Sequence, residues 1–512
     1  MIWVLQWLKI TVMLLIVNIN LNFWGGELSR SFFVGVINLN EKFTAPIADA
    51  MQKYSNDGAL AFHTPGHKQG LGAHSLLKKL ITSEGLRQEV SLMEELDDLH
   101  SPQTCIKDAE KLAAKLFNAD DCLFIINGTT CAIQTMIFAT LKPNDFVFVP
   151  RNSHRSVMAG LILSGAIPIY LPVEFSADLQ IPLNLSVETL KLAIKKFPMA
   201  RALILTSPNY YGVAADVKKI AEILHAAGML LLVDEAHGAH LQFCEELPIS
   251  AMDAGADLAA QSTHKILGSM TQTSMLMVKN FDAEKVRRAA SLLQSTSPNY
   301  LLLASLDIAR LQMQENPEKI SAVVQLSKNL RAEINSIDGL KTFDAVKNFG
   351  LDLTKVTVNV EELGLTGIAA EKILRHEFKI QCELSDSVNL LFLITYADNC
   401  ATIKKLVDAL QKLSTRKINT VIKRFINNPA EITQSEVSPR EIYFAENKTV
   451  ELKKAVNKIC AEEVTFYPPG IPILNPGEII TAEIIDFIES QKEIGGRIIG
   501  SADTKLETIK II

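Results

Sequence analysis

The chain has 512 residues, of which 48% are hydrophobic and 21% charged, so it can bury one large core and two smaller ones. The formal net charge of −6 gives no electrostatic sign of nucleic-acid binding, and it mildly favours cationic small molecules. The seven cysteines are odd in number and form no C-x-x-C pair, which excludes a disulfide framework and favours a reducing, cytoplasmic location.

The first forty residues form an apolar extension. Ile2 to Trp24 is almost wholly apolar and reaches roughly the length needed to span a bilayer, but Lys9 lies inside the run. The basic start and small-residue cleavage site of a secretory signal are missing. A membrane anchor and a start codon assigned too far upstream are the remaining interpretations, and we favour the second.

The first functional element is an apolar strand, Cys122 to Ile126, that runs into a glycine turn. Gly128, Thr129 and Thr130 follow, and Cys131 to Leu141 is helix-like. Free backbone N–H groups at a helix N-terminus beside two hydroxyls can hold a phosphate. A simple helix cap is the alternative. The Gly-Lys-Ser/Thr ending of a nucleotide P-loop is absent, which argues against ATP.

The second element is a continuous apolar run from Met229 to Val233, which predicts a buried parallel strand with Asp234 at its carboxyl end. Open α/β sheets bind ligands at that edge. A carboxylate there could hold a pyridine nitrogen protonated, as pyridoxal phosphate chemistry requires. The alternative is that Asp234 caps the following helix.

The third element is Lys265, which follows the mostly apolar run from Ala256 to Ala260 and the polar residues Ser262 and His264. A desolvated lysine loses its proton readily, and the neutral amine condenses with an aldehyde. A solitary lysine after a strand is usually an ordinary surface residue. The stretch of chain between Asp234 and Lys265 is long enough for one helix and one strand. We therefore favour the interpretation that the two residues belong to one cofactor site.

Apolar runs alternate with helix-like stretches from Tyr54 to Asn280, which predicts a doubly wound parallel sheet. Its further strands are expected at Phe146–Val149, Ile167–Leu171, Ala202–Leu205 and Met275–Val278. Helices are expected from Ala283 to Ile334. A small β-α-β lobe follows, with strands at Val356–Val360 and around Cys382 and Val388–Ile394, and helices at Ile368–His376 and Ala401–Leu413. Beyond Lys417 a Pro/Gly-punctuated module is expected.

The three elements come in the order seen in the fold-type-I family of pyridoxal-phosphate enzymes, and further motifs narrow the resemblance. From about Thr44 onward, the chain strongly resembles bacterial ornithine/lysine/arginine decarboxylases, in the short form that lacks an N-terminal receiver-like domain. The motifs that carry this resemblance are Phe62–Gly70, Leu96–His100, Arg151–Ser156, Ser438–Glu441, Tyr467–Pro472 and Pro476–Glu478.

The resemblance implies a fold-type-I α/β architecture, with a transferase-like large domain built on a mostly parallel sheet, a small α/β lobe and a C-terminal α+β module. We place the large cofactor-binding domain at residues 41–310, the small domain at 311–416 and the C-terminal module at 417–512, after an extension at 1–40.

The resemblance also implies a role for each site residue. Lys265 would hold pyridoxal 5'-phosphate through a Schiff base, Asp234 would bond the pyridine nitrogen, and His154 would stack on the ring. The remaining cofactor contacts would come from Gly128, Thr129, Thr130, Ala236, Ser262 and His264, together with Ser295 of the Ser295–Ser297 cluster, which resembles a segment that reaches the phosphate of a neighbouring subunit. That last contact would make a homodimer or higher homo-oligomer obligatory.

The reaction implied is decarboxylation of a basic amino acid, arginine or lysine before ornithine, for polyamine biosynthesis. Lys265, His264, Asp234 and His154 are the expected catalytic residues, with Lys265 or His264 returning a proton to the α-carbon. Candidates for contact with the substrate are His237, Glu441, Glu446 and Glu478.

Two other enzyme or binding functions stay open. Aminotransferases, aldolases and acyl-transferring synthases share the lysine, the aspartate and the phosphate cradle. A pyridoxal-phosphate-binding regulatory protein without catalysis is the second, although the intact Lys265, Asp234 and His154 argue against it. No metal is expected, because Pro65 and Gly66 separate His63 from His67 and break the helical spacing of a zinc pair.

Overall fold

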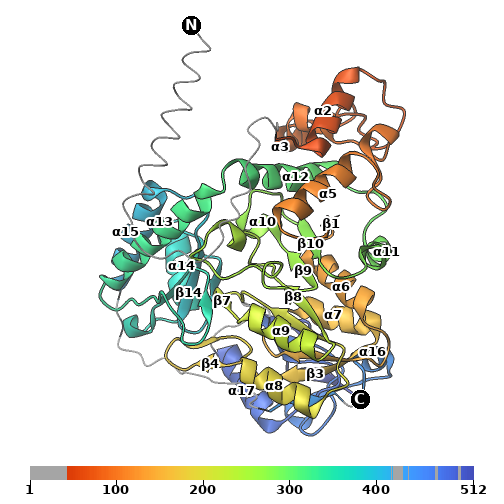
Figure 1. The fold of residues 1–512 in the computed structure, drawn as a ribbon. Helices are drawn as coiled ribbons and strands as arrows, with labels where there is room; N and C mark the ends of the chain where they lie inside the picture. The colour runs from red at the N-terminus through yellow and green to blue at the C-terminus, as the bar shows by residue number, and fades with distance from the viewer. Residues whose placement is uncertain (1–42, 417, 419–430, 436, 468–470, 494–496) are drawn as a thin grey trace, which may run out of the picture. The chain divides into compact units, whose positions relative to one another are not determined.

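The computed structural model describes residues 43–416, 418, 431–435, 437–467, 471–493 and 497–512 (Figure 1). Contacts group Thr44 to Ile512 into one compact unit. The predicted extension at 1–40 lies outside the described residues, as do Pro468, Pro469 and Gly470 of the C-terminal motif. Within the described ranges, the chain has no helix that is both long and apolar enough to cross a membrane.

An eight-stranded sheet is the centre of the fold, and the predicted mostly parallel sheet is confirmed. Strands β9, β8, β6, β2 and β3 run parallel to one another, whereas β10 is antiparallel to both of its neighbours. The short strand β15, which comes from the C-terminal region and was not predicted, pairs antiparallel with β3. The order across the sheet is β1 (Asp121–Ile125), β10 (Ser274–Val278), β9 (Leu258–Gln261), β8 (Leu230–Asp234), β6 (Ala202–Thr206), β2 (Phe146–Pro150), β3 (Ile167–Leu171) and β15 (Thr433–Gln434).

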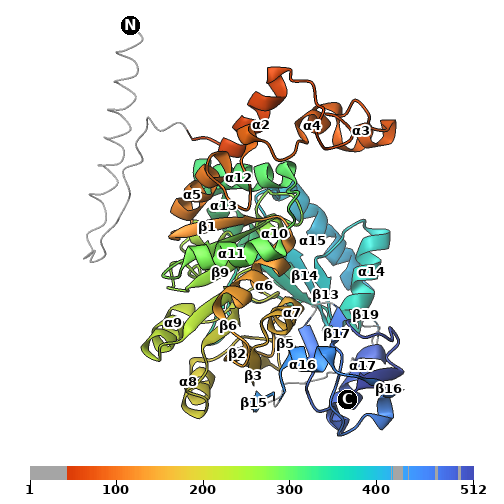
Figure 2. The same ribbon diagram turned by 90° about the vertical axis from the view of Figure 1, so that its right-hand side faces the viewer.

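Helices cover both faces of this sheet, which explains why the strands are almost continuously apolar. In β6, Ala202 and Ile204 face one hydrophobic cluster while Leu203 and Leu205 face the other. The first face packs against α6 (Gly128–Thr140), α7 (Arg155–Ser164) and α11 (Ala283–Leu293). The second packs against α2 (Pro46–Asp57), α5 (Cys105–Leu116), α8 (Val187–Lys196), α9 (Val217–Ala226) and α12 (Tyr300–Glu315) (Figures 1 and 2).

The segment between α2 and α5 is built from short elements and turns. It contains α3 (Ser75–Ile81), α4 (Ser83–Gln88) and the 3-10 turn η1 (Glu94–Leu96). His67 Nε2 lies 2.6 Å from Glu89 Oε2, whereas His63 Nε2 lies 2.9 Å from the Tyr54 hydroxyl. The two histidines of the Phe62–Gly70 motif therefore have different partners.

A second, antiparallel sheet forms the small lobe. Strand β14 (Asn389–Leu393) lies between β12 (Lys355–Asn359) and β13 (Leu384–Ser385). The predicted strands and helices of the lobe are confirmed, but its strands do not form a parallel β-α-β unit. The helices that cover it are α13 (Glu318–Asn335), α14 (Gly367–Glu377) and α15 (Cys400–Ser414), with the 3-10 turn η3 (Glu361–Leu363).

The described C-terminal residues have their own apolar cluster. Helix α16 (Pro439–Phe444) contacts α7, which packs on one face of the large sheet, and Figure 2 shows the two helices side by side. The other elements are β16 (Lys448–Glu451), η4 (Leu452–Lys454), β17 (Val464–Tyr467), β18 (Ile471–Leu474), α17 (Ala482–Glu493), β19 (Arg497–Ile499) and β20 (Thr508–Ile511). Four two-residue strands, β4 (Phe175–Ser176), β5 (Ile181–Pro182), β7 (Val213–Ala214) and β11 (Gly350–Leu351), form two small pairs. The domain limits at 310, 416 and 417 stay a prediction.

Candidate active site

A cavity of about 460 Å³ lies where the loops after the central strands meet. Strands β2, β6, β8 and β9 are parallel, so their carboxyl ends lie along one edge of the sheet. Strand β1 ends at the same edge, because it and β9 are both antiparallel to β10. The predicted site residues that line the cavity are Gly128, Thr129, Thr130, His154, Asp234, Ala236, His237, Ser262, His264 and Lys265.

Lys265 lies in the short helix α10 (Thr263–Ile266), directly after β9. Its Nζ is 2.9 Å from His237 Nε2 and 5.3 Å from the centre of the Tyr210 ring. Burial lowers the pKa of Lys265 to about 8, although Asp234 opposes the shift. The amine is therefore close to the balance between its charged and neutral forms at physiological pH.

His237 follows β8 and faces the lysine across the cavity. Burial, and then the charge of Lys265, hold its pKa well below the usual range, so the imidazole is neutral. Lys265 Nζ can then donate to His237 Nε2, which leaves the imidazole proton on Nδ1. The Tyr210 ring packs at 4.6 Å from the His237 ring and fixes its orientation.

Asp234 ends β8 and is almost completely buried. Its Oδ1 accepts a hydrogen bond from the Ala236 N–H at 3.1 Å. Burial raises the pKa of Asp234, while the positive charge of Lys265 acts in the opposite direction. A cationic N–H brought into the cavity would stabilise the carboxylate further, so Asp234 is suited to hold a proton on a ligand ring nitrogen.

His154 lies in the loop between β2 and α7 and caps the first turn of α7. Its Nδ1 accepts a hydrogen bond from the Ser156 N–H at 3.2 Å, with the Ser156 hydroxyl 2.8 Å away. Burial, followed by the charges of Lys265 and Arg155, lowers the pKa of His154 to about 4. A neutral, half-buried imidazole at the cavity wall can stack on a flat ligand ring.

The first turn of α6 forms the other end of the cavity. The helix begins at Gly128, three residues earlier than predicted, so Thr129 and Thr130 belong to its first turn. Gly128 has a φ of +81°, which favours glycine at this position. The Thr129 hydroxyl bonds the Ser262 hydroxyl and donates to Ser274 Oγ at 3.0 Å. Backbone N–H groups and hydroxyls from two loops thus meet where a phosphate could bind.

His264 adds a second ring nitrogen to this end of the cavity. Its Nδ1 donates to the Thr273 carbonyl at 2.6 Å, which leaves Nε2 without the proton when the ring is neutral. Burial lowers the pKa of His264. The side chain can therefore accept a hydrogen bond, or carry a proton after taking one up.

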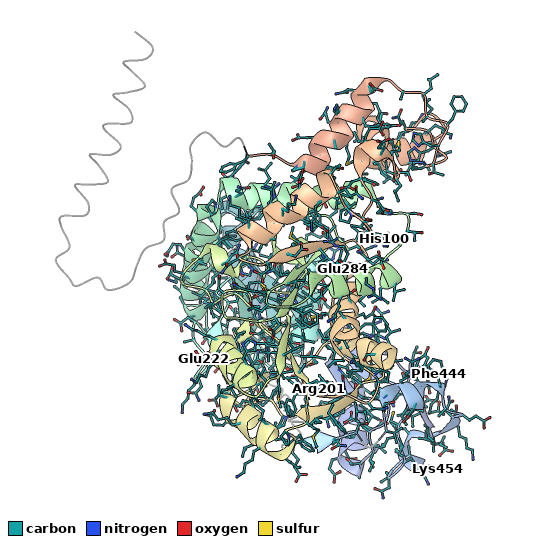
Figure 3. All side chains as sticks on the ribbon, turned by 45° about the vertical axis from the view of Figure 1, so that its right-hand side comes forward. His100, Arg201, Glu222, Glu284, Phe444 and Lys454 are labelled. Atoms are coloured by element: carbon teal, nitrogen blue, oxygen red, sulfur yellow. The ribbon has the colours of Figure 1, made fainter. Side chains whose placement is uncertain are left out.

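Four predicted residues do not line the cavity. Ser295 lies in the exposed loop before α12, where its carbonyl oxygen is 2.9 Å from Nε2 of His100, which Figure 3 labels. Glu441 and Glu446 are exposed at α16 and just after it. Glu478 is bound to Arg151 instead. Their predicted roles toward a neighbouring subunit or the substrate stay predictions.

The end of β6 and the loop after it supply cavity residues that the sequence analysis missed. Thr206, Asn209, Tyr210 and Tyr211 line the cavity. The Tyr211 hydroxyl donates to Asp386 at 2.6 Å, which ties this loop to the small lobe. The signal was available, because these residues directly follow the predicted strand Ala202–Leu205 at the carboxyl edge.

His240, which follows Asp234 in the same loop as His237, is fully buried and does not line the cavity. Its Nε2 lies 3.1 Å from both Asp352 Oδ1 and Thr354 Oγ1. The buried Lys355 lies 3.6 Å from Asp352 Oδ2. Burial raises the pKa of Asp352, but His240 and Lys355 outweigh this and hold it well below its usual range. This buried polar group underlies the loop that carries Tyr211, since Asp352 N–H donates to the Gly212 carbonyl at 2.8 Å.

The fold and the residues at this edge of the sheet define a class of protein: an α/β enzyme of the fold-type-I group, with a lysine, a buried carboxylate and a glycine turn at a helix N-terminus around one cavity. Among solved structures, the lysine decarboxylase LdcF of Francisella novicida superposes with a TM-score of 0.81, at 23% identity over 92% of this chain and 81% of that one. This likeness confirms the predicted fold.

The family follows from the sequence matches. The family described as Orn/Lys/Arg decarboxylase, major domain, matches residues 45–358, and its C-terminal domain matches residues 419–503. An arginine decarboxylase of Bacillus anthracis is 38% identical over 92% of this chain and 98% of its own length. One of Bacillus subtilis is 38% identical over 91% of this chain and 97% of its own length. The chain belongs to the Orn/Lys/Arg decarboxylase family, and the predicted class of enzyme is confirmed.

Proposed function

We propose that the chain decarboxylates arginine with pyridoxal 5'-phosphate and releases agmatine and carbon dioxide. The observation that carries this proposal is the gathering of Lys265, Asp234 and His154 around one cavity in a member of this family. Arginine is chosen because the relatives that match nearly the whole chain are named arginine decarboxylases. The cytoplasmic location stays a prediction.

The residues present fit the cofactor. A buried carboxylate, an amine of lowered pKa and a set of N–H groups and hydroxyls line the same cavity. Lys265 would bind the aldehyde carbon, Asp234 the ring nitrogen, and Gly128, Thr129, Thr130 and Ser262 the phosphate. When bound, pyridoxal phosphate supplies an acceptor for the electron pair that stays on the α-carbon as the carboxylate leaves.

Asp234 would keep a proton on the ring nitrogen, because a cationic N–H partner would stabilise its buried carboxylate. His154 would pack beside the ring and limit its tilt. The cavity walls would hold the α-carboxylate in the orientation that favours its loss over other bond cleavages. These are binding and orienting roles, which a buried site performs without reorganisation.

Return of a proton to the α-carbon requires a donor at the same edge. Lys265 Nζ exchanges its proton easily because its pKa is close to neutral, and His237 Nε2 is its hydrogen-bond partner at 2.9 Å. His264 Nε2 is the other candidate, since its Nδ1 is occupied by the Thr273 carbonyl. Lys265 would also be the amine that takes the place of the product amine on the cofactor.

We also propose that the active unit is a homodimer or higher homo-oligomer. The segment between Gly58 and Leu92 exposes Leu60, Phe62, Leu71, Leu76 and Leu80, each by more than half of its surface. Exposed apolar residues in this number favour a protein partner. A second copy would cover them and bring its Ser295 segment to the cofactor phosphate.

Product analysis tests the reaction and the substrate together. The full chain is incubated with pyridoxal phosphate in an equimolar mixture of arginine, lysine and ornithine, and amines and keto acids are measured by mass spectrometry. Agmatine is the expected product, whereas cadaverine or putrescine would reassign the substrate. Keto acid without amine would identify an aminotransferase.

The control variant is Lys265→Ala. It is expected to lose both turnover and the absorbance of covalently held cofactor, because no other lysine lines the cavity among the described residues. A fully active Lys265→Ala protein would overturn the mechanism.

A further inference from the structure

Two arginines flank His154 in the chain, and each forms an ion pair with a glutamate from the C-terminal residues. Arg151 Nη1 donates to Glu478 Oε1. Arg155 Nε lies 3.3 Å from Glu463 Oε1. The loop that carries His154 is thus held on both sides by residues more than 300 positions away in the sequence.

The pair at Arg151 is largely buried and has further partners. The side chains of Arg151 and Glu478 are 14% and 13% exposed. The guanidinium also donates to Thr433 Oγ1 at 3.0 Å and lies 4.4 Å above the Tyr170 ring. Glu478 Oε2 accepts from the backbone N–H and the side-chain amide of Asn475, at 2.9 and 3.0 Å. Ion pairs with this many fixed partners constrain geometry more than surface pairs do.

The ion pair of Arg155 with Glu463 is more exposed than that of Arg151 with Glu478, but only at its arginine. The Glu463 side chain is 11% exposed and also accepts from Thr465 Oγ1 at 3.0 Å, whereas Arg155 is 46% exposed. At the far end of α7, Arg440 of α16 donates to the Leu163 carbonyl at 2.9 Å. Helix α7 is therefore fastened to the C-terminal residues at both of its ends.

C-terminal residues also lie directly behind His154. Pro472 and Asn475 line a small void of about 20 Å³ together with Arg151, His154 and Tyr170. His154 also lines the large cavity that Lys265 and Asp234 line. The same residue thus borders both the cofactor cavity and the void that the C-terminal residues line.

We propose that Glu478 and Glu463 are positioning residues: through Arg151 and Arg155 they fix the loop that presents His154 to the cofactor ring. This inference rests on the proposed function, in which His154 packs against that ring. It assigns the C-terminal residues a task in cofactor binding, in addition to their own fold.

The same contacts argue against substrate recognition by Glu478. Both of its carboxylate oxygens accept hydrogen bonds, from Arg151 and Asn475, and neither Glu478 nor Glu463 lines the cofactor cavity. A substrate guanidinium could bind Glu478 only by displacing Arg151. Loss of the carboxylate is therefore expected to act on the loop and not on one substrate.

The first experiment measures the loop itself, in the full chain without cofactor. Amide hydrogen exchange is followed in peptides spanning residues 150–158, where the N–H groups of Arg151, Ser153 and Val157 donate to backbone carbonyls. We expect faster exchange there in Glu478→Gln, a smaller increase in Glu463→Gln, and the largest in the double variant. The control is Glu489→Gln, which removes an ion pair with Lys492 in α17, away from the His154 loop.

The second experiment measures cofactor affinity by titrating the same apo proteins with pyridoxal phosphate. Glu478→Gln is expected to bind it about tenfold more weakly, since a misplacement of 1 Å can cost up to about 100-fold at an active site. The circular dichroism of the bound cofactor should weaken as its ring loses a fixed orientation. Arg155→Glu and Glu463→Arg should each weaken cofactor binding when made alone. The double variant that carries both changes, the charge-reversed pair, should restore the affinity.

The outcomes separate the inference from the proposed function. Wild-type exchange and affinity in both glutamine variants would overturn the positioning role. A raised KM for arginine with unchanged exchange would instead make Glu478 a substrate contact, which also overturns it. If Glu478→Gln fails to fold, Glu463→Gln and the charge-reversed pair decide. A wild-type chain that binds cofactor but releases no amine contradicts the proposed function and leaves the exchange result standing.

Discussion

Burial and several neighbouring charges together set the pKa of the Lys265 ammonium group. Burial lowers its pKa to about 8, Asp234 and Glu383 act to raise it, and Lys355 acts to lower it. Only the neutral amine attacks an aldehyde. The protein thus makes an amine that is ordinarily charged reactive near neutral pH, without needing a separate base.

The pH dependence of cofactor incorporation follows from this shift. Because the lowered pKa leaves the amine protonated below about pH 8 and neutral above it, incorporation into the apo chain should accelerate as the pH rises through about 8 and then level off. Stopped-flow absorbance between pH 6 and pH 10 measures it. Lys355→Met removes a buried positive charge, so its transition should move to higher pH. A rate that is flat over this range would contradict the shift.

Glu235 is a buried carboxyl group whose ionised form the fold disfavours. Its oxygens accept from the Ala251 N–H and the Gln261 side-chain amide, both at 2.7 Å, and burial raises its pKa to about 8. The folded chain therefore holds a proton on Glu235 that the unfolded chain releases above about pH 4.3. This contribution to stability is complete below that pH and is lost as the pH rises toward 8.

Glu235→Gln should remove this pH dependence. Glutamine has nearly the shape of the protonated acid, so stability at pH 5 should stay within about 1 kcal/mol of wild type. Between pH 5 and pH 8 the variant should lose less stability than the wild-type apo chain. Denaturant unfolding at several pH values measures the difference, and parallel pH profiles would show that Glu235 is ionised in the folded chain.

At the scale of elements, the start of α14 lies against the backbone of the small-lobe sheet with no room for a side chain. A Cβ on Gly367, the first residue of this helix, would lie 2.2 Å from the Asn389 carbonyl oxygen and 2.6 Å from that of Asp386. Both atoms belong to the backbone around the start of β14, so neither can rotate away. Glycine is required here by close approach and not by a special backbone conformation.

Gly367→Ala is therefore expected to destabilise the small lobe by about 1–3 kcal/mol, the usual cost of forced overpacking. Gly66→Ala is the matched control, since a Cβ there meets nothing within 4 Å. Thermal unfolding of the two apo variants gives the comparison. An equal midpoint for both would mean that α14 can shift away from β14 without cost.

Sequence patterns predicted the elements whose signals are local. Asp234 follows a continuous apolar run and Lys265 a mostly apolar one, and the parallel strands bring both to one edge as expected. The antiparallel order of the small lobe was not predicted, because helices between strands allow either direction. The partnership of Glu478 with Arg151 could not be predicted either, since 327 residues separate them and no local pattern encodes the contact.

At the scale of the whole molecule, two exposed apolar regions compete as contact surfaces. One is the segment between Gly58 and Leu92, where Phe62 is 91% and Leu80 82% exposed. The other is at α16, where Tyr443 and Phe444 form an edge-to-face pair and are 61% and 72% exposed. Figure 3 labels Phe444 on the C-terminal part of the chain. The first region exposes more large apolar residues than the second, so we place the proposed subunit contact there.

A charge in the middle of the true interface should separate the copies, because burial of an unpaired carboxylate is costly. We expect Phe62→Asp combined with Leu80→Asp to shift the chain toward monomers in sedimentation velocity runs across a range of concentrations. Decarboxylation should fall in parallel, because each proposed site then lacks the Ser295 segment of a second copy. Phe444→Asp is the matched control and should keep both the assembly and the activity. Monomers from Phe444→Asp alone would move the interface to α16, and an active monomer from the double variant would show that one chain completes the site by itself.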